Sequence, residues 1–145
     1  MDGDHVGLVG FSLGAYLALA SAADKDLQLG AVVELFGGLP RSLQDMARNL
    51  PPTLILHGAA DAVIPVREAF TLRRLLNEAK RVCEFKVYPE AGHVFSDPDE
   101  EGQESKPLSL EALLRTKEQV SDADERIAAF LEKYVKPVPK RVAER

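Results

Sequence analysis

The amino-acid sequence predicts a single α/β domain in which about four parallel strands are covered by helices on both faces. Three observations support this fold class. Four short apolar runs rich in β-branched residues are each followed by glycine or proline, segments with helical spacing separate them, and the runs barely alternate between apolar and polar residues. A length of 145 residues, 46% of them hydrophobic, suits one compact domain spanning 1–145.

The expected elements alternate along the chain, beginning with a strand. In order they are 5–10, 13–23, 30–36, 42–50, 53–57, 66–82, 83–88 and 108–135. The helix at 42–50 has the weakest pattern, and the last helix is expected to break near Ser121. Pro65 stands where a helix begins, and the last helix has acidic residues near its start and lysines near its end. The remaining segments are a leader at 1–4, an acidic loop at 96–107 and a candidate disordered tail at 137–145.

Charge and cysteine content limit the expected partners and compartment. The net charge of −5 has the wrong sign for binding phosphate backbones, so no nucleic-acid partner is expected. The longest apolar stretch, 13–23, is shorter than the roughly 20 residues of a membrane span, so no membrane partner is expected. The first five residues lack the features of a secretory signal, and the lone cysteine, Cys83, suits a reducing compartment. We therefore expect a cytoplasmic protein with Cys83 as a small core residue.

The sequence Gly10-Phe11-Ser12-Leu13-Gly14 carries the clearest chemical signal. It follows an expected strand and opens an expected helix, which is the setting in which G-x-S-x-G forms a nucleophile elbow. Such a sharp turn is expected to need small residues at both flanking positions, which Gly10 and Gly14 supply. Ser12 is the candidate nucleophile, and the Leu13 amide at the helix start is the candidate oxyanion donor. The alternative is that Ser12 only caps the helix.

A serine nucleophile needs a base and an orienting acid, which hydrolases with this elbow supply in the order Ser, acid, His. Asp61 follows the third expected strand, and His93 follows the fourth. Because the carboxyl ends of parallel strands meet at one edge, Ser12, Asp61 and His93 are expected to converge as a catalytic triad. The alternatives are that Asp61 only caps a local turn and that His93 is an ordinary loop residue.

Other residues near these positions receive different interpretations. His57, four residues before Asp61, is interpreted as a hydrogen-bonded structural residue rather than the base. Glu34, near the end of the second expected strand, is the second-choice orienting acid. Tyr16 is expected to pack on the sheet. No metal site and no cofactor are predicted. The expected walls of the substrate pocket are Phe11, Phe36, Val63, Val94 and Phe95.

Three stretches, VGLVGFSLGAYLALA, LILHGAADAVIPV and YPEAGHVF, resemble the signature blocks of the dienelactone hydrolase branch of the α/β-hydrolase superfamily. The spacings from Ser12 to Asp61 and from Asp61 to His93 resemble that branch too. The resemblance runs from about residue 5 to residue 135, and Phe36-Gly37-Gly38 resembles the aromatic-glycine stretch lining the family's site. It implies an α/β-hydrolase fold with Ser12 as nucleophile, Asp61 as acid and His93 as base.

Departures from the family pattern shape the expected activity. Dienelactone hydrolases carry cysteine where this chain has Ser12, so the implied reaction is hydrolysis of small carboxylic esters through an acyl-enzyme. Glu90 and Val94 stand where relatives often have glycine. The alternative from another class is a non-catalytic or fragmentary hydrolase domain that acts as a binding or assembly module. A peptidase or an acyltransferase would use the same triad.

The chain resembles only the C-terminal part of a hydrolase, from the elbow strand onward, and its first expected strand corresponds to that elbow strand. The earlier strands of the superfamily, and the loop that supplies its second oxyanion donor, are not expected here. One edge of the first strand is therefore expected to be bare, and an apolar bare edge tends to pair with another chain. The sequence thus predicts a homo-oligomer formed through this edge.

Overall fold

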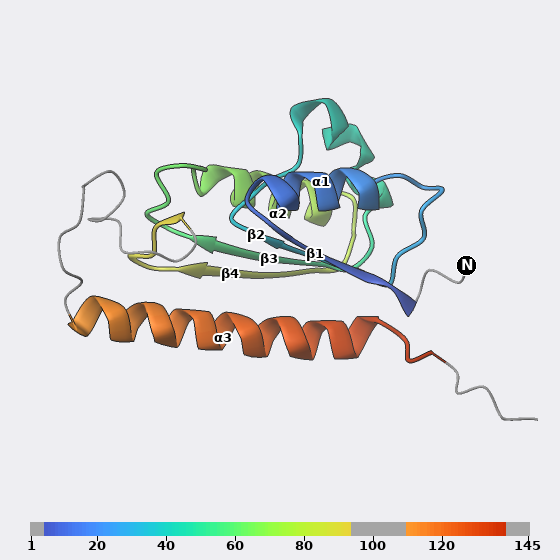
Figure 1. The fold of residues 1–145 in the computed structure, drawn as a ribbon. Coiled ribbons are helices and arrows are strands. Elements are labelled where there is room, and N and C mark those ends of the chain that lie inside the picture. The colour runs from blue at the N-terminus through green and yellow to red at the C-terminus, as the bar shows by residue number, and fades with distance from the viewer. Residues whose placement is uncertain (1–4, 94–109, 139–145) are drawn as a thin grey trace, which may run out of the picture.

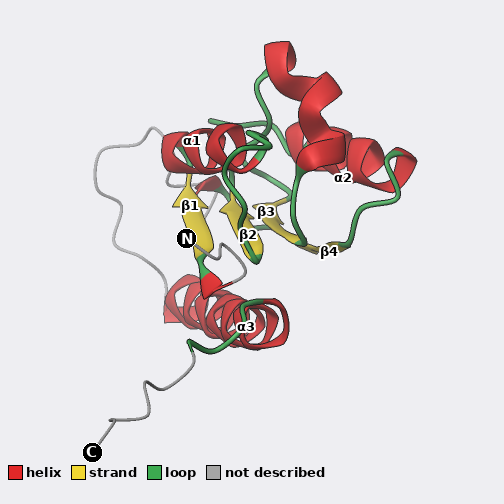
Figure 2. Ribbon diagram, turned by 90° about the vertical axis from the view of Figure 1, so that its right-hand side faces the viewer, coloured by secondary structure: helices red, strands yellow, loops and turns green. Residues whose placement is uncertain are grey.

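The computed structural model describes residues 5–93 and 110–138 and confirms the α/β class (Figures 1 and 2). The expectations for residues 1–4, 94–109 and 139–145 lie outside the described residues. Four strands form one parallel sheet in the order β1-β2-β3-β4. The elements are β1 (Gly7–Phe11), α1 (Leu13–Ala22), β2 (Ala31–Leu35), the 3₁₀ helix η2 (Arg41–Asn49), β3 (Thr53–Gly58), α2 (Arg67–Glu78), β4 (Cys83–Tyr88) and α3 (Leu110–Tyr134).

The helices form two layers around the sheet. Figures 1 and 2 show α1 and α2 on one face, together with η2, and the long α3 across the opposite face. All four strands run in the same direction, so their carboxyl ends share one edge of the sheet. No helix within the described ranges is both long and apolar enough to cross a membrane.

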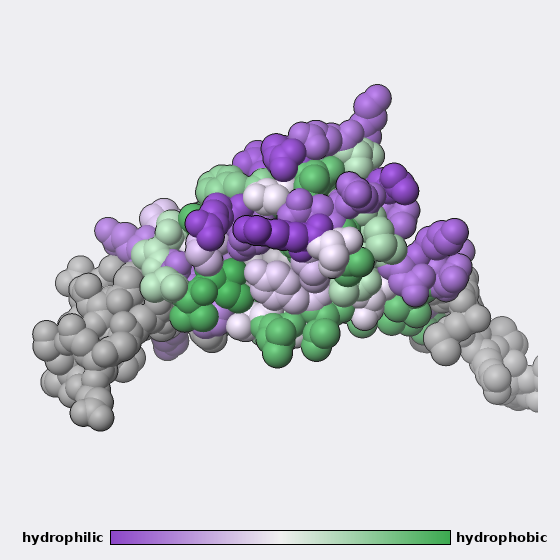
Figure 3. Space-filling view, turned by 90° about the horizontal axis from the view of Figure 1, so that it is seen from above, coloured by the Kyte–Doolittle hydropathy of each residue, from purple (hydrophilic) through white to green (hydrophobic). Residues whose placement is uncertain are grey.

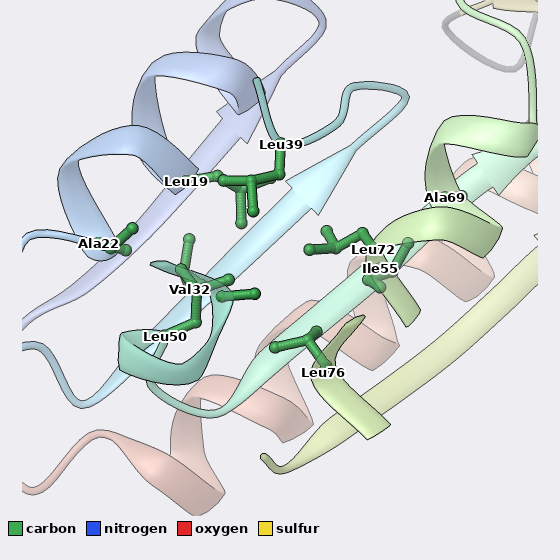
Figure 4. Packing of buried hydrophobic residues seen from close by; sticks show 11 residues of the cluster. Leu19, Ala22, Val32, Leu39, Leu50, Ile55, Ala69, Leu72 and Leu76 are labelled. Atoms are coloured by element: carbon green, nitrogen blue, oxygen red, sulfur yellow. The ribbon is translucent and has the colours of Figure 1, made fainter. Parts of the chain in front are cut away.

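A hydrophobic core lies on each face of the sheet. Side chains alternate between the two faces along a strand, so a strand covered on both sides buries all of its residues and is mostly apolar. Every residue of β2 and β3 is accordingly buried. The cluster beneath α1 and α2 includes Leu19, Val32, Leu50, Ile55, Leu72 and Leu76 (Figure 4). The cluster facing α3 includes Val33, Leu35, Leu54, Leu56 and Phe130.

The predicted break near Ser121 is wrong, because α3 runs without interruption from Leu110 to Tyr134. The Tyr88 hydroxyl, at the end of β4, donates a hydrogen bond to Asp122 at 2.8 Å. Arg126, one helical turn later, donates to the same carboxylate at 2.7 Å. Ala123 is buried in the core facing α3. These contacts hold the helix together where the local sequence suggests an interruption.

Two other helix boundaries differ from the prediction. The segment expected as a helix at 42–50 is the 3₁₀ helix η2, and α2 ends at Glu78 instead of residue 82. Lys80 has φ of 55°, in the left-handed region, and the N–H of Arg81 donates back to the carbonyl of Leu76 at 2.8 Å. This arrangement ends a helix even without a glycine at the turn position.

Candidate active site

Ser12 occupies a sharp turn between β1 and α1. Its backbone has φ of 52° and ψ of −119°, a strained conformation for a residue with a side chain. The turn is held by the Ser12 N–H, which donates to the carbonyl of Leu35 at 3.0 Å. Its side chain makes no capping hydrogen bond to α1, so the interpretation of Ser12 as only a helix cap is wrong.

Close packing at the elbow explains one flanking glycine but not the other. A Cβ atom at Gly10 would come within 2.4 Å of the Gly14 carbonyl oxygen, whereas a Cβ atom at Gly14 would meet open space. The expectation that both positions must be small therefore holds only for Gly10. Gly37, which belongs to the aromatic-glycine stretch named in the sequence analysis, also packs here, because a Cβ atom on it would lie 2.4 Å from Cβ of Ala15 and 3.0 Å from the Ser12 carbonyl oxygen.

The imidazole of His93 lies directly beside the Ser12 hydroxyl. The Oγ atom of Ser12 and Nε2 of His93 are 3.0 Å apart, although the two residues are 81 positions apart in the sequence. His93 is reached through a tight turn after β4, in which Glu90 has φ of 60°. Its ring stacks edge-on against Phe36 at 5.4 Å between centroids. The imidazole is thereby supported on one side by an aromatic ring.

Asp61 completes a hydrogen-bonded chain of three side chains. The Nδ1 atom of His93 donates to Oδ2 of Asp61 at 2.9 Å. The other carboxylate oxygen, Oδ1, accepts the N–H groups of Val63 and Ile64 at 2.9 and 2.8 Å. Asp61 therefore does cap a local turn, but with one oxygen only, while the second oxygen contacts His93. With Nδ1 as donor, Nε2 of His93 is the acceptor that faces the Ser12 hydroxyl.

The loops that carry Asp61 and His93 are bonded to each other. The N–H of Ala59 donates to the carbonyl of Tyr88, and the N–H of Ala60 donates to the carbonyl of Ala91, both at 2.9 Å. These bonds continue the parallel pairing of β3 with β4 beyond the ends of both strands. The distance between Asp61 and His93 is thus set by the backbone.

The amino-acid sequence matches a known family over nearly its whole length. Residues 1–135 match the sequence profile of the dienelactone hydrolase family. The chain belongs to the dienelactone hydrolase family. The resemblance inferred from the three motif blocks is therefore confirmed.

Curated relatives in this family share about a third of the aligned residues. A probable carboxylesterase of rice (Oryza sativa subsp. japonica) is 34% identical over 101 residues, which cover 66% of this chain and 43% of the relative. A Methylorubrum extorquens protein named for carboxymethylenebutenolidase is 34% identical over 103 residues, covering 65% of this chain and 35% of that protein. The chain thus spans less than half the length of these two relatives.

Solved structures share the fold of this chain. A Klebsiella pneumoniae protein named for dienelactone hydrolase superposes with a TM-score of 0.64 and 31% identity, over 88% of this chain and 52% of that one. A puromycin-hydrolysing peptidase of Mycobacterium tuberculosis superposes with a TM-score of 0.72 over 97% of this chain and 23% of its own. The identity with the peptidase is 18%, so this second likeness shows the fold alone.

The second-choice acid of this dienelactone hydrolase family member, Glu34, does not contact His93. It is fully buried in β2, and its Oε2 accepts the N–H of Gly37 at 2.9 Å. Burial raises the pKa of Glu34 to about 8, despite that hydrogen bond. Its Oε1 has no hydrogen-bond partner among the described residues. The Glu34 carboxyl group therefore contacts the loop after β2 instead of His93, and the hypothesis that Glu34 orients the base is wrong.

His57 has the structural setting expected for it, whereas Cys83, expected as a core residue, is only partly buried and packs against the edge of a core cluster. His57 is buried, and its Nε2 donates to the carbonyl of Ile64 at 2.8 Å. Burial lowers the pKa of His57 and raises that of the Cys83 thiol to about 11. Neither side chain contacts Ser12. Tyr16 lies near Gly38 and Glu68, and its pKa is raised by burial and by the Glu68 carboxylate.

The expected pocket walls lie at different depths around the three side chains. Phe36 is buried behind His93, and Phe11 contacts it at 6.1 Å between ring centroids while remaining 55% exposed. Val63 is also exposed, whereas Val94 and Phe95 fall outside the described residues. A cavity of about 590 Å³, lined by residues such as Gly30 and Pro51, contains none of the three catalytic candidates. Within the described residues no group of three or more His, Cys, Asp or Glu side chains could hold a metal ion.

Proposed function

We propose that this chain is a serine hydrolase that cleaves small carboxylic esters through an acyl-enzyme. The observation that supports it is the unbroken hydrogen-bonded chain from Ser12 Oγ through the His93 imidazole to Asp61 Oδ2, at 3.0 and 2.9 Å. A buried carboxylate, an imidazole and a hydroxyl in this order form the arrangement that activates serine for attack on a carbonyl carbon.

In the proposed reaction His93 first acts as general base. It accepts the Ser12 proton at Nε2 while Oγ forms a bond to the ester carbonyl carbon, and Asp61 stabilises the resulting imidazolium. The oxyanion is stabilised by the N–H of Leu13, the first residue of α1, where backbone N–H groups lack intrahelical acceptors. The imidazolium then protonates the departing alcohol. Water attacks the acyl-serine by the same route and releases the carboxylic acid.

The chain between β2 and β3 favours small soluble substrates. Residues 36–52 connect the two strands, and the 3₁₀ helix η2 occupies much of this connection. It holds no inserted lid domain that would cover an extended lipid chain. The exposed rings and aliphatic groups of Phe11 and Val63 would contact the acyl or alcohol part of a short ester.

Hydrolysis of a short-chain chromogenic ester tests the proposal. The purified chain should turn the ester over, and Ser12→Ala should abolish turnover while retaining the fold. Ser21→Ala is the matched control, because Ser21 is an exposed serine near the end of α1 and contacts none of the three side chains. Equal turnover by the wild type and Ser12→Ala would contradict the proposal. Acceptors other than water, offered in the same assay, separate an esterase from an acyltransferase.

One relative favours a second candidate function. A rice protein named as a probable inactive carboxylesterase is 33% identical over 89 residues, covering 58% of this chain and 36% of its own. Sequence similarity to the family therefore extends to a member described as inactive. A non-catalytic binding or assembly module is the function to adopt if the folded chain hydrolyses none of the esters offered.

We further propose that the chain forms a homo-oligomer through β1 and acts in the cytoplasm. Residues 6–23 contain no charged side chain, and in the described part of the chain β1 pairs with β2 alone. Figure 3 shows hydrophobic surface along its lower margin, on the side where Figure 1 places β1 and α1. We call the exposed apolar residues of this uncharged segment, Val6, Val9, Phe11, Leu13 and Leu17, the apolar strip. An unprotected apolar edge of this kind favours pairing with a second copy.

A further inference from the structure

His57 contacts both ends of the turn that carries Asp61, yet the proposed mechanism does not use it. It is completely buried in β3, four residues before Asp61. Its Nε2 atom lies 2.8 Å from the carbonyl oxygen of Ile64 and 3.4 Å from Oδ2 of Asp61. A polar ring in an apolar strand is thus placed against the acid of the candidate triad.

The proton on the His57 ring can be located from these contacts. Burial lowers the pKa of His57, so the ring is neutral at pH 7 and carries one N–H. A carbonyl oxygen can only accept a hydrogen bond, so the proton that faces Ile64 is on Nε2. Nδ1 is then an acceptor, and it has no hydrogen-bond partner in the part of the chain that the structure describes. The single donor of the ring is therefore directed at the turn of residues 61–64.

The turn of residues 61–64 is held by several hydrogen bonds, two of which involve the backbone of Ile64 at its end. The Ile64 N–H donates to Oδ1 of Asp61, and the Ile64 carbonyl accepts from His57. Oδ2 of Asp61 accepts from His93 and faces the His57 N–H. Loss of that N–H would leave the part-buried Ile64 carbonyl without this donor, and the turn would no longer be fixed from the side of β3.

We propose that His57 is a positioning residue, whose Nε2–H fixes the turn of residues 61–64 so that Oδ2 of Asp61 meets Nδ1 of His93. It acts through Asp61 and contacts neither Ser12 nor a reacting atom. Its effect on turnover rests on the proposed function. Its effect on the hydrogen bond between Asp61 and His93 does not, because that bond exists in the folded chain without substrate.

Proton NMR of the full chain tests the inference. An imidazole N–H bonded to a carboxylate gives a strongly downfield resonance, which His93→Gln identifies by its loss. His57→Asn places an amide near the position of Nδ1 but not of Nε2, and it should broaden or shift this resonance. The kcat should fall about 10–100-fold, the usual cost of losing an outer partner of a functional ligand in metal sites, with little change in KM. His57→Gln, whose amide reaches the position of Nε2, should restore most of the resonance and most of the wild-type kcat.

Thr53→Val is the matched control. Thr53 is equally buried at the start of β3, and its hydroxyl donates to the Pro51 carbonyl at 2.8 Å, at the other end of the strand from Asp61. This variant should lose thermal stability without a change in the resonance or in kcat. If His57→Asn does not fold, His57→Leu replaces it. An unchanged resonance in either folded variant overturns the inference. If the wild-type chain hydrolyses no ester but the resonance still changes in the His57 variants as expected, the proposed function is contradicted and the inference is supported.

Discussion

Gly58 lies directly against the peptide of Ala91. A Cβ atom on Gly58 would come within 2.3 Å of the Ala91 carbonyl oxygen and within 2.5 Å of the Gly92 carbonyl oxygen. The end of β3, which leads to Asp61, is therefore packed against the turn that delivers His93. Only a residue without a side chain permits this approach.

Gly58→Ala should therefore separate the loops that carry Asp61 and His93. Because the clash is with backbone atoms, we expect a loss of about 1–3 kcal/mol in the free energy of unfolding and a fall in kcat for ester hydrolysis. Urea unfolding and steady-state kinetics measure the two effects. Gly14→Ala is the control for the glycine-to-alanine change itself. Its Cβ would meet open space and alanine favours a helix, so this variant should not lose stability. Wild-type stability and kcat in Gly58→Ala would show that the close contact does not constrain the site.

Asp61→Asn should leave the turn of residues 61–64 intact but impair the base. The amide oxygen of asparagine can still accept the N–H groups of Val63 and Ile64, as Oδ1 of Asp61 does at 2.9 and 2.8 Å. Its NH₂ group would face Nδ1 of His93 and favour the wrong tautomer, so kcat should fall about 10³–10⁴-fold. Asp24→Asn, an exposed loop position, should retain wild-type kcat. Retention of more than a tenth of the wild-type kcat by a folded Asp61→Asn protein would remove Asp61 from its proposed role.

Glu34 should make the stability of the chain depend on pH. Burial raises the pKa of Glu34 from its ordinary value of 4.5 to about 8 in the folded chain, so folding requires proton uptake between these two values. The stabilisation is complete below pH 4.5 and is lost as pH rises to about 8. Glu34→Gln should therefore gain stability relative to the wild type across this range, by at most about 1.4 kcal/mol per pH unit.

Urea unfolding at pH 5 and pH 8 measures the Glu34 effect. Glu78→Gln is the control, because Glu78 is an exposed partner of Arg74 on α2 and should give a difference that changes little between the two pH values. If the difference between the wild type and Glu34→Gln is the same at pH 5 and pH 8, the buried carboxyl does not titrate between them.

The elements of the fold and the three catalytic candidates could be predicted because their signals are local. Apolar runs ending in glycine or proline mark strands, and functional residues gather at the carboxyl ends of parallel strands. The break assigned near Ser121 failed because a contact from Tyr88, far away in the sequence, stabilises the helix there. The packing needs of Gly37 and Gly58, and the opposite case of Gly14, depend on which backbone passes beside each residue. No periodicity in the sequence carries that information.

The position of Glu34 shows the same limit for a polar side chain. A glutamate near the end of a strand at the functional edge is a reasonable second candidate for the orienting acid. From the sequence alone, Glu34 and Asp61 both lie near the carboxyl end of a strand. Glu34 nevertheless does not meet His93. It pairs with Ile55 inside the sheet, and its carboxyl accepts the Gly37 N–H. Which of two acids meets His93 is therefore a property of the packed loops and not of residue type.

Leu17→Glu should dissociate the proposed homo-oligomer. Leu17 is 63% exposed on α1 within the apolar strip, and a carboxylate there would have to be buried against the second copy. Light scattering after gel filtration, across a tenfold range of protein concentration, should give the mass of an oligomer for the wild type and that of a monomer for the variant. The monomer mass to compare is 15.9 kDa.

The control is Leu27→Glu, which adds the same charge at an exposed leucine outside the apolar strip. It should keep the wild-type mass, so that a change in Leu17→Glu alone assigns the contact to the β1 and α1 surface. A wild-type chain that stays at the monomer mass at every concentration would contradict the oligomer. An oligomer that survives in Leu17→Glu would place the contact elsewhere on the molecule, because a buried unpaired carboxylate costs several kcal/mol and would outweigh a small apolar interface.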